Sequence, residues 1–434
     1  MTSVAPAQPV RPSALLPLGQ LARLSAYWLG LTAIDAAVGQ FTANRLTFHD
    51  FVATADIGKA LAVVGLAGAV IGIVVQPTIG TMSDYAVTRW GRRKPFIVFG
   101  SLLDVIFLFG IATSNSLLAL AVFIALLSFS TNVARGPFQG YVPDLIAARQ
   151  VGMASALVGL MQILGNVTGF LLIIIGIALG AAPLALMAVA IVELVTMISV
   201  VYRVAPGPAP ASRAGRSWWA IAREAWGTDI LAERSYVWLL GSRLFFLTGG
   251  SILVNLAQPY LAQVFGLSEK STAGMVLVFL VVIALGNVVA AIPASRLSDR
   301  VGRKPIIYVA CLVGGVGVAV AGLAPVLPIA VVGIGLFGVS AGMFLAVDWA
   351  LMTDIIPMAA AGRYMGLSNV ATGASSPIGL AAGGLILDGV NRILGAGSGP
   401  RAAYIVGAAL YVLAAVLLKP VDPRPREERL SADR

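Results

Sequence analysis

The feature that most limits what this chain can fold into is a succession of long apolar runs. Most of them come close to the ~20 residues that a helix needs to cross a hydrocarbon layer ~30 Å thick. Only 11% of the 434 residues are charged, whereas about a quarter are charged in soluble domains. The sequence therefore predicts an all-α integral membrane protein with about twelve transmembrane helices. The runs lie at 22–43, 58–82, 96–113, 117–135, 151–179, 182–202, 236–265, 272–294, 305–325, 327–350, 365–388 and 402–418.

Two short charged signals occur twice, at nearly the same spacing. The first is a Ser-Asp pair followed by Gly-Arg-Arg-Lys-Pro or Gly-Arg-Lys-Pro, and the second is an Asp followed shortly by Arg-x-x-Gly. Because two independent signals repeat at nearly one offset, the sequence predicts two copies of one six-helix plan. The first signal comprises Gly80, Asp84, Arg92 and Arg93, then Asp299, Gly302 and Arg303; the second comprises Asp144 and Arg149, then Asp354 and Arg363.

These patterns divide the chain into two bundles, a linker and two tails. The linker opens with a Pro-rich segment and then places Trp219, Ala222, Trp226 and Ile230 on one helical face. That pattern predicts an amphipathic helix at the membrane interface, with a plain solvated linker as the alternative. The expected units are a tail at 1–21, a six-helix bundle at 22–204, the linker at 205–235, a second six-helix bundle at 236–418 and a tail at 419–434.

The distribution of positive charge predicts how the chain crosses the membrane. Cytoplasmic loops of membrane proteins retain Lys and Arg, so the side with few of them is the outer side. We therefore expect a multi-pass protein of the cell membrane, with both tails and the linker in the cytoplasm. The net charge of +10 then reflects these loops rather than nucleic-acid binding, since no basic stretch alternates with aromatic residues. The outer side carries only Arg45, Lys59, Lys270, Arg392 and Arg401.

Charged side chains inside the runs are the first candidates for a functional site, because a carboxylate in hydrocarbon costs about 2.5–3.5 kcal/mol on insertion scales. Asp35 lies well inside the first run and is the main candidate for a protonatable or substrate-binding group, with a bond between helices as the alternative. Asp104 and Glu193 fit a functional and a structural role equally well. Asp348 lies near the inner end of its run and fits a gate network. Arg243 needs an acidic partner, for which Asp35 or Asp348 is the natural choice.

Neutral polar side chains inside the runs are informative as well, because sugars are recognised by amides, hydroxyls and aromatic faces. Gln162 and Asn166 share a helix face at a spacing of four. Asn255, Gln258 and Tyr260 follow closely in the seventh run. We expect these five residues to lie at the solute site.

The repeated loop resembles that of the major facilitator superfamily, whose halves each carry Gly-x-x-x-Asp followed by Gly-Arg-Arg/Lys between the second and third helices. Both copies are present. More narrowly, the segment from Val75 to the end of this loop, and the segment Arg135-Gly-Pro-Phe-Gln-Gly-Tyr-Val-Pro-Asp144, are similar to the plant sucrose/proton carriers and their relatives. The resemblance implies a twelve-helix fold and transport of a solute.

The related glycoside, pentoside and hexuronide cation symporters share a first-helix Asp, which falls on Asp35. Their paired carboxylates for sodium fall on Gly72 and Gln76, which cannot supply that charge, so the resemblance disfavours sodium coupling. Their fourth-helix sugar-binding Asp falls on Arg135, and an acid of the plant sucrose carriers falls on Ser128.

The resemblance also implies gates at the inner face. Asp84 and Asp299 would lie near helix ends and accept hydrogen bonds from arginines of the loop or of the opposite half, in latches that part in one state. The alternative is that the arginines only set the topology. Solute would bind near the midplane between the halves and be reached alternately from each side. The opposite-half or neighbouring arginines expected to serve these latches are Arg135, Arg149 and Arg363, with Asp144, Asp348 and Asp354 around them.

The function that these residues favour is proton-coupled import of a disaccharide or related glycoside by a monomer. An exporter of drug-like or metabolite solutes fits Asp35 and Arg243 equally well. A receptor or assembly factor on a transporter-like scaffold is a third reading, against which the buried charges argue. An enzyme is disfavoured, because no nucleophile is paired with a base and His49 lies outside the runs. One Cys and one His are too few for a zinc site, so we expect no metal and no cofactor.

Overall fold

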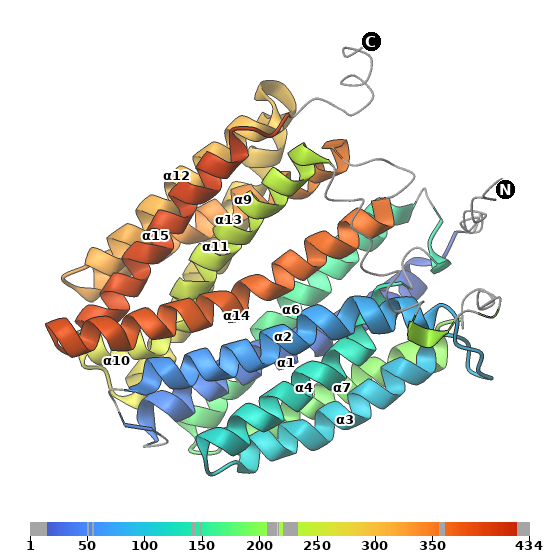
Figure 1. Cartoon of the computed structure of the whole chain (residues 1–434), viewed down its shortest axis with the longest axis horizontal. Helices are drawn as coiled ribbons and strands as arrows, with labels where there is room; N and C mark the ends of the chain where they lie inside the picture. Colours follow the sequence, from blue (N-terminus) through green and yellow to red (C-terminus); the bar gives the residue numbers. More distant parts are fainter. Residues whose placement is uncertain are drawn as a thin grey trace.

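The computed structural model describes residues 15–49, 52–53, 56–140, 144–147, 150–205, 215, 217–219, 233–355 and 361–422, without the side chains of 151–152, 155–156, 349, 353–354, 361–366 and 369–370. Within these residues the secondary structure is helical and includes no strand. The long helices run side by side along one common direction (Figure 1). The predicted all-α class is therefore confirmed.

The N-terminal half contains six long helices in the described part of the chain. Their ends follow local signals: the Ser116 hydroxyl accepts a hydrogen bond from the Ala119 amide at 3.2 Å where one helix begins, and Pro95 lies in the first turn of another. The helices are α1 (Leu18–Phe48), α2 (Ile57–Ser83), α3 (Lys94–Thr113), α4 (Leu117–Gln139), α6 (Val151–Ala178) and α7 (Ala182–Arg203).

The C-terminal half repeats this plan with one interruption. Its first span is broken at Leu256, where α9 ends and the short α10 begins. Its helices are α9 (Arg234–Asn255), α10 (Ala257–Phe265), α11 (Glu269–Val301), α12 (Arg303–Leu323), α13 (Leu327–Ile355), α14 (Ala361–Leu394) and α15 (Ser398–Leu418).

Eleven helices of the described residues are long and apolar enough to cross a membrane. α1 is more polar but has 31 residues, which span about 46 Å at 1.5 Å per residue. It is therefore long enough for the twelfth crossing that the apolar runs predict. The two halves have equivalent packing: α2 packs on α4 as α11 packs on α13, and α3 packs on α7 as α12 packs on α15.

The two halves meet mainly at one end of the molecule. We call the end with the α2–α3 and α11–α12 connections the terminal face, because α1 starts and α15 ends there (Figure 1), and the opposite end the far face. α2 of one half packs along α14 of the other. Toward the far face α2 is buried at many positions from Ile57 to Ala69, but between Val70 and Met82 its residues are exposed or half-buried. The halves therefore separate toward the terminal face.

Candidate functional site

A cavity of about 510 Å³ lies between the two halves. It is lined by α1, α2, α4 and α6 of the N-terminal half and by α9 and α14 of the C-terminal half. Most of its polar groups come from the N-terminal half, together with the aromatic ring of Trp28. The polar lining residues are Thr32, Asp35, Thr42, Gln76, Ser128, Thr131, Asn132, Arg135, Gln139, Gln162, Asn166, Asn255, Thr372 and Ser376.

Asp35 and Arg135 form an ion pair across this cavity. Arg135 Nη2 lies 2.6 Å from Asp35 Oδ2, and the Asp35 side chain is 51% exposed. Asp35 was one of two expected partners of Arg243, and it pairs with Arg135 instead. One expectation is corrected, because Arg135 lies in the cavity lining rather than at a gate. The reason is the helical repeat of α4, which brings Arg135 onto the same cavity face as Ser128 and Asn132.

Three of the predicted neutral residues also line the cavity. The Asn166 amide donates to the Gln162 carbonyl oxygen at 3.0 Å, and the Thr32 hydroxyl donates to the same oxygen at 3.1 Å. Asn255 donates to the hydroxyl and the carbonyl oxygen of Ser376 at 3.1 and 3.2 Å. The side-chain amides of Asn166 and Asn255 are thus held at the cavity wall by their partners, whereas Gln162 contributes its backbone carbonyl oxygen to these bonds.

A further amide pair, Gln76 and Gln139, was missed as part of the site. Gln76 Nε2 donates to Gln139 Oε1 at 3.0 Å, and both residues line the cavity. A signal was present, because Gln139 follows Arg135 by four residues and therefore shares its helix face.

Gln258 and Tyr260, which we expected near the solute, lie outside the described cavity lining. Gln258 is buried and donates to the carbonyl and side-chain oxygens of Gln40, at 3.0 and 2.8 Å. The Tyr260 hydroxyl donates to the Ala321 carbonyl oxygen at 2.5 Å within the C-terminal half. The helix break at Leu256 explains the difference, because it changes the helical phase between Asn255 and the residues that follow.

Arg243 pairs with Asp348, the second of its two expected partners, inside the C-terminal half. Both side chains are buried. Arg243 also donates from Nε and Nη2 to the Thr372 hydroxyl, at 3.1 and 3.0 Å. Asp348 is thus a buried partner rather than part of a gate at the inner end, and Thr372, which lines the cavity, connects the pair to it.

Asp104 and Glu193 lie in the interior of the N-terminal half, outside the described cavity lining. Tyr27 donates to Glu193 Oε1 at 3.2 Å, and Thr131 donates to Asp104 Oδ1 at 2.9 Å.

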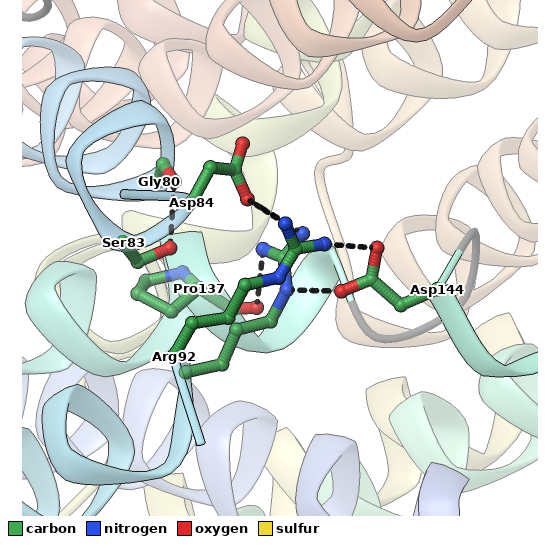
Figure 2. Close-up of polar contacts among 7 residues, drawn as sticks. Gly80, Ser83, Asp84, Arg92, Pro137 and Asp144 are labelled. Carbon is green, nitrogen blue, oxygen red and sulfur yellow. Dashed lines mark hydrogen bonds and ion pairs between the residues drawn. The ribbon is translucent and has the colours of Figure 1, made fainter. Parts of the chain in front are cut away.

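A charged cluster closes the end of the N-terminal half at the terminal face (Figure 2). Asp144 binds Arg92 and Arg93 at 2.5 and 2.6 Å. Asp84 binds Arg93 at 2.9 Å and lies 3.7 Å from Arg92. Burial raises the pKa of Asp84, and the positive charges of Arg93 and Arg92 oppose that rise only in part. Arg93 also donates to the Pro137 carbonyl oxygen at 3.1 Å, so the cluster ties the loop to α4.

Gly80 contributes to this end through its backbone. Its carbonyl oxygen accepts a hydrogen bond from the Ser83 hydroxyl at 2.7 Å (Figure 2). A methyl group on Gly80 would lie 3.6 Å from the Gly136 carbonyl, so α2 and α4 come close together here.

The second copy of the loop is arranged differently from the first. Asp299 is exposed, and no hydrogen bond or ion pair joins it to a residue that the structure describes. α11 continues past Asp299 to Val301, and Gly302, with φ of 90°, leads directly into α12. Ten residues, 84–93, connect α2 to α3 in the first copy, whereas Gly302 alone connects α11 to α12 in the second. Arg303 donates instead to the Ala350 carbonyl oxygen, much as Arg93 donates to Pro137.

In this conformation the described residues of the two loops make different contacts, and the equivalence of the two latches stays a prediction. Three residues expected to take part in the latches lie outside the described part of the structure: Arg149, and the side chains of Asp354 and Arg363.

A pair of lysines, missed in the sequence, has the same role in both halves. Lys94 donates to the carbonyl oxygen of Val204 at 2.6 Å, just beyond α7. Lys304 donates to the carbonyl oxygens of Lys419 and Val421 at 2.7 and 2.8 Å, just beyond α15. Each lysine thus satisfies carbonyl groups at the end of the last helix of its half. The signal was the Lys-Pro dipeptide that both loops share.

At the far face, polar contacts join the two halves. The amides of Gly58 and Lys59, at the start of α2, donate to the two carboxylate oxygens of Asp388 on α14 at 2.8 and 2.7 Å. Asp56 pairs with Arg392 at 2.7 Å and with Lys59 at 3.0 Å, and the bond and charge of Lys59 lower the pKa of Asp56. We call the contact between Asp388 and the start of α2 the far-face lock.

The sequence did not indicate Asp388 as a contact between the halves, because it lies at the end of an apolar run and no charged residue of the other half stands out as its partner. Its partners are backbone amides, which carry no sequence signal. Two further bonds close the same face: Glu269 accepts from Asn44 and contacts His49, both at 3.0 Å.

Comparison with known proteins agrees with this geometry. The family model described as Major Facilitator Superfamily matches residues 26–290 and 239–434. Sucrose transport protein SUC3 of Arabidopsis thaliana is 30% identical over 143 residues, which cover 28% of this chain and 24% of that protein. Sucrose transport protein SUT3 of Oryza sativa subsp. indica is 31% identical over 143 residues, 28% of each chain. The matched segment spans about a quarter of the length of these relatives.

Solved structures match over most of the chain at low identity. The D-xylose-proton symporter has a TM-score of 0.69 at 17% identity, covering 94% of this chain and 97% of that one. The nucleoside transporter NupG has a TM-score of 0.66 at 14% identity, covering 93% and 98%. A bacterial homolog of the human lysosomal transporter Spinster, in an inward-facing and occupied conformation, has a TM-score of 0.69 at 15% identity, covering 92% and 95%. These likenesses show the fold, and the family model covers nearly the whole chain. The chain belongs to the Major Facilitator Superfamily and is a multi-pass membrane protein of that family.

Proposed function

We propose that this protein is a proton-coupled symporter of a disaccharide or a related glycoside, working by alternating access with its terminal face in the cytoplasm. The observation that carries the proposal is the central cavity, which combines one carboxylate–guanidinium pair with a wall of amides and hydroxyls. Its volume of about 510 Å³ falls within the roughly 300–1,000 Å³ of small-molecule sites.

The lining favours a neutral, hydroxyl-rich solute. Asp35 and Arg135 are the only charged residues among those described in the lining, and they neutralise each other. A charged solute would have to break this pair, whereas sugar hydroxyls can both donate to and accept from Gln76, Asn166 and their neighbours. Trp28 offers an aromatic face for the apolar side of a sugar ring. The similarity to sucrose transport proteins and to the D-xylose-proton symporter supports the same solute class.

A proton is the coupling ion that the cavity suits best. Gly72 and Gln76, one helix away from Asp35, provide no second carboxylate beside it. A proton on Asp35 removes its charge and frees the Arg135 guanidinium, whose donors can then bind solute oxygens. Proton binding and solute binding would thus assist each other.

Alternating access accounts for the uneven contact between the halves. The far-face lock and its neighbours close one end, while α2 loses its buried residues toward the terminal face. This arrangement fits a state that opens to the terminal face. The return to the other state requires the far-face contacts to part and the halves to meet at the terminal face.

The test is uptake by purified protein in liposomes, with a panel of labelled disaccharides, glycosides and monosaccharides, with and without an inside-alkaline pH gradient. We expect one group of glycosides to accumulate only with the gradient, and a protonophore to abolish that accumulation. Gradient-driven extrusion of drug-like solutes without glycoside uptake would support the exporter instead. Solute binding without any translocation would support a receptor.

A further inference from the structure

Two carboxyl groups lie beside each other in the interior of the N-terminal half, apart from the central cavity. Asp104 on α3 and Glu193 on α7 both have a relative exposure of 0%. No ion pair joins either of them to a Lys or Arg among the described residues. The charged and titratable groups that face them are Tyr27 from α1 and Arg135 from α4, and Arg135 is already paired with Asp35.

The hydrogen-bond donors around this pair are unevenly distributed. Asp104 Oδ1 accepts from the hydroxyls of Ser130 and Thr131, the latter at 2.9 Å. Glu193 Oε1 accepts from the Tyr27 hydroxyl at 3.2 Å. The other two oxygens, Asp104 Oδ2 and Glu193 Oε2, are buried and have no donor among the described residues. One oxygen of each carboxyl group is thus left without a partner.

The two carboxyl groups are within hydrogen-bonding reach of each other. Ionised carboxylates only accept hydrogen bonds, so two of them side by side leave facing lone pairs and like charges in a buried site. A single proton changes both features, because one group becomes a donor to the other and one negative charge is removed. The unpartnered oxygens therefore indicate a proton as the missing component.

The surrounding packing favours a proton over a larger cation. A methyl group on Gly30 of α1 would lie 2.8 Å from Glu193 Cα. A methyl group on Gly100 of α3 would lie 2.7 Å from the Ser130 carbonyl oxygen. The helices that bear the pair are therefore in backbone contact with their neighbours on both sides.

We propose that Asp104 and Glu193 form a second proton-binding site, a carboxylic acid–carboxylate pair that shares one proton and exchanges it with the central cavity through Thr131. Thr131 lines that cavity and donates its hydroxyl to Asp104. In the loading step, a hydronium ion in the cavity gives a proton to Thr131 Oγ1 and becomes water, while the original hydroxyl proton passes to Asp104 Oδ1. Rotation of the Asp104 carboxyl group about its Cβ–Cγ bond then turns this proton toward Glu193. Release runs in reverse, and the threonine is unchanged in both directions.

The first test looks for the proton itself by infrared spectroscopy of the purified full-length protein. At neutral pH we expect the C=O stretching band of a protonated carboxylic acid, shifted in deuterated buffer. The band should remain in Asp35→Asn and disappear in the double variant Asp104→Asn/Glu193→Gln, whose neutral amides can still bond each other. If the double variant does not fold, Asp104→Asn and Glu193→Gln singly should each shift or remove the band. An absent acid band in the wild type, or one that every variant leaves unchanged, overturns the proposal.

The second test addresses the route. After transfer to deuterated buffer, Thr131→Val should slow deuteration of the acid band at least about tenfold, the change that about 1.4 kcal/mol on the barrier produces. Thr131→Ser keeps the hydroxyl and should exchange like the wild type. Equal rates in wild type and Thr131→Val exclude Thr131 as the route. Neither measurement uses a solute, so their outcome is independent of whether glycoside uptake is observed.

Discussion

Asp35 is tolerated inside the membrane because Arg135 lies 2.6 Å from it and water can enter the cavity that both line. Each charge lowers the free-energy cost of placing the other in the membrane, so the two residues have to be considered together. Changing one member alone leaves an unpaired charge, whereas changing both leaves two neutral side chains.

Asp35→Asn should abolish accumulation of solute in response to a pH gradient while solute exchange across the membrane continues. The amide has nearly the shape of the protonated acid but cannot release a proton. Counterflow with labelled solute measures exchange in the same liposomes and shows that the variant is folded. Continued pH-driven accumulation would assign the coupling to another acid.

Arg135→Gln should destabilise the protein more than Asp35→Asn/Arg135→Gln does. The single change leaves Asp35 without its cation, and the coupling energy of neighbouring charged residues is about 0.5–3 kcal/mol. We expect the lower part of this range because the Asp35 side chain is 51% exposed. Thermal unfolding of the wild type, both single variants and the double variant completes the cycle, and additive effects would mean that the ion pair contributes nothing.

For single residues, the sequence predicts how deep a side chain lies in the membrane better than it predicts which residue that side chain contacts. Position within an apolar run was enough to place four polar residues deep in the membrane, and all four line the cavity: Asp35, Gln162, Asn166 and Asn255. The partner of Asp35 does not follow, because it depends on which face of α4 turns toward α1. Gln258 shows the same limit, since its position depends on a helix break that the uninterrupted apolar run conceals.

The two ends of α2 make contacts of different kinds. The charged cluster at the terminal face fixes the loop after α2 to α4 within one half, whereas the far-face lock joins α2 of one half to α14 of the other. The first contact can persist while the halves move, but the second must break. The two ends of α2 therefore have different roles.

At the charged cluster we expect opposite effects from its two acids. Because burial raises the pKa of Asp84, this group stabilises the fold fully only below its unfolded pKa of about 4, and that contribution is lost as pH rises through the higher folded pKa. Asp84→Asn should therefore raise Tm relative to the wild type more at pH 7 than at about pH 4. Asp144→Asn should lower Tm at pH 7, because Arg92 and Arg93 lose their nearest carboxylate. A Tm difference for Asp84→Asn that does not vary with pH would contradict the assigned pKa direction.

Gly58→Ala should prevent complete closure of the far face. The added methyl group would lie 1.9 Å from the Gly384 carbonyl oxygen, across the boundary between the halves. Alanine is otherwise a better helix residue than glycine, so any loss comes from this contact. Spin labels at Leu118 and Ile329, exposed on opposite halves near this face, should show a longer distance. Gly274→Ala is the control, since no atom lies within 4 Å of its added methyl group; equal distances in the two variants would rule out the proposed closure contact.

Helix boundaries can be predicted from the sequence where a capping residue or a proline marks the end of the helix. The runs that start after Pro95 and Ser116 agree with the observed starts of α3 and α4, because caps and prolines act locally. The break at Leu256 has a weaker signal, Pro259 in the first turn of α10. The far-face lock has none, since a carboxylate on backbone amides is invisible to sequence patterns.

For the whole molecule, the repeated loops and the number of apolar runs were enough to predict the family fold. The conformation was not predictable, because it depends on the balance between contacts at the two faces. The loops that look alike in sequence also differ in structure: the first copy forms a cluster of two acids and two arginines, whereas Asp299 of the second copy is exposed and has no such partner among the described residues.

The orientation in the membrane is open to a direct test. With Cys311 replaced by Ser, single cysteines at Ser217 and Ala396, both exposed, report on the linker and on the far face. We expect an impermeant thiol reagent applied to intact cells to label Ala396→Cys only, because the charge distribution places the linker in the cytoplasm. Labelling after permeabilisation shows that both cysteines are reactive, and the reverse pattern would invert the orientation.

The neutral charge of the Asp35–Arg135 pair has an electrical consequence. Without a proton the pair carries no net charge through the membrane field, and with a proton it carries one positive charge. In the proposed cycle, the loaded carrier therefore responds to the membrane potential by about 2.3 kcal/mol per 100 mV across the full field, while the empty carrier returns without that dependence. A negative interior would thus draw in the loaded form, and import would run on voltage even where no pH difference exists.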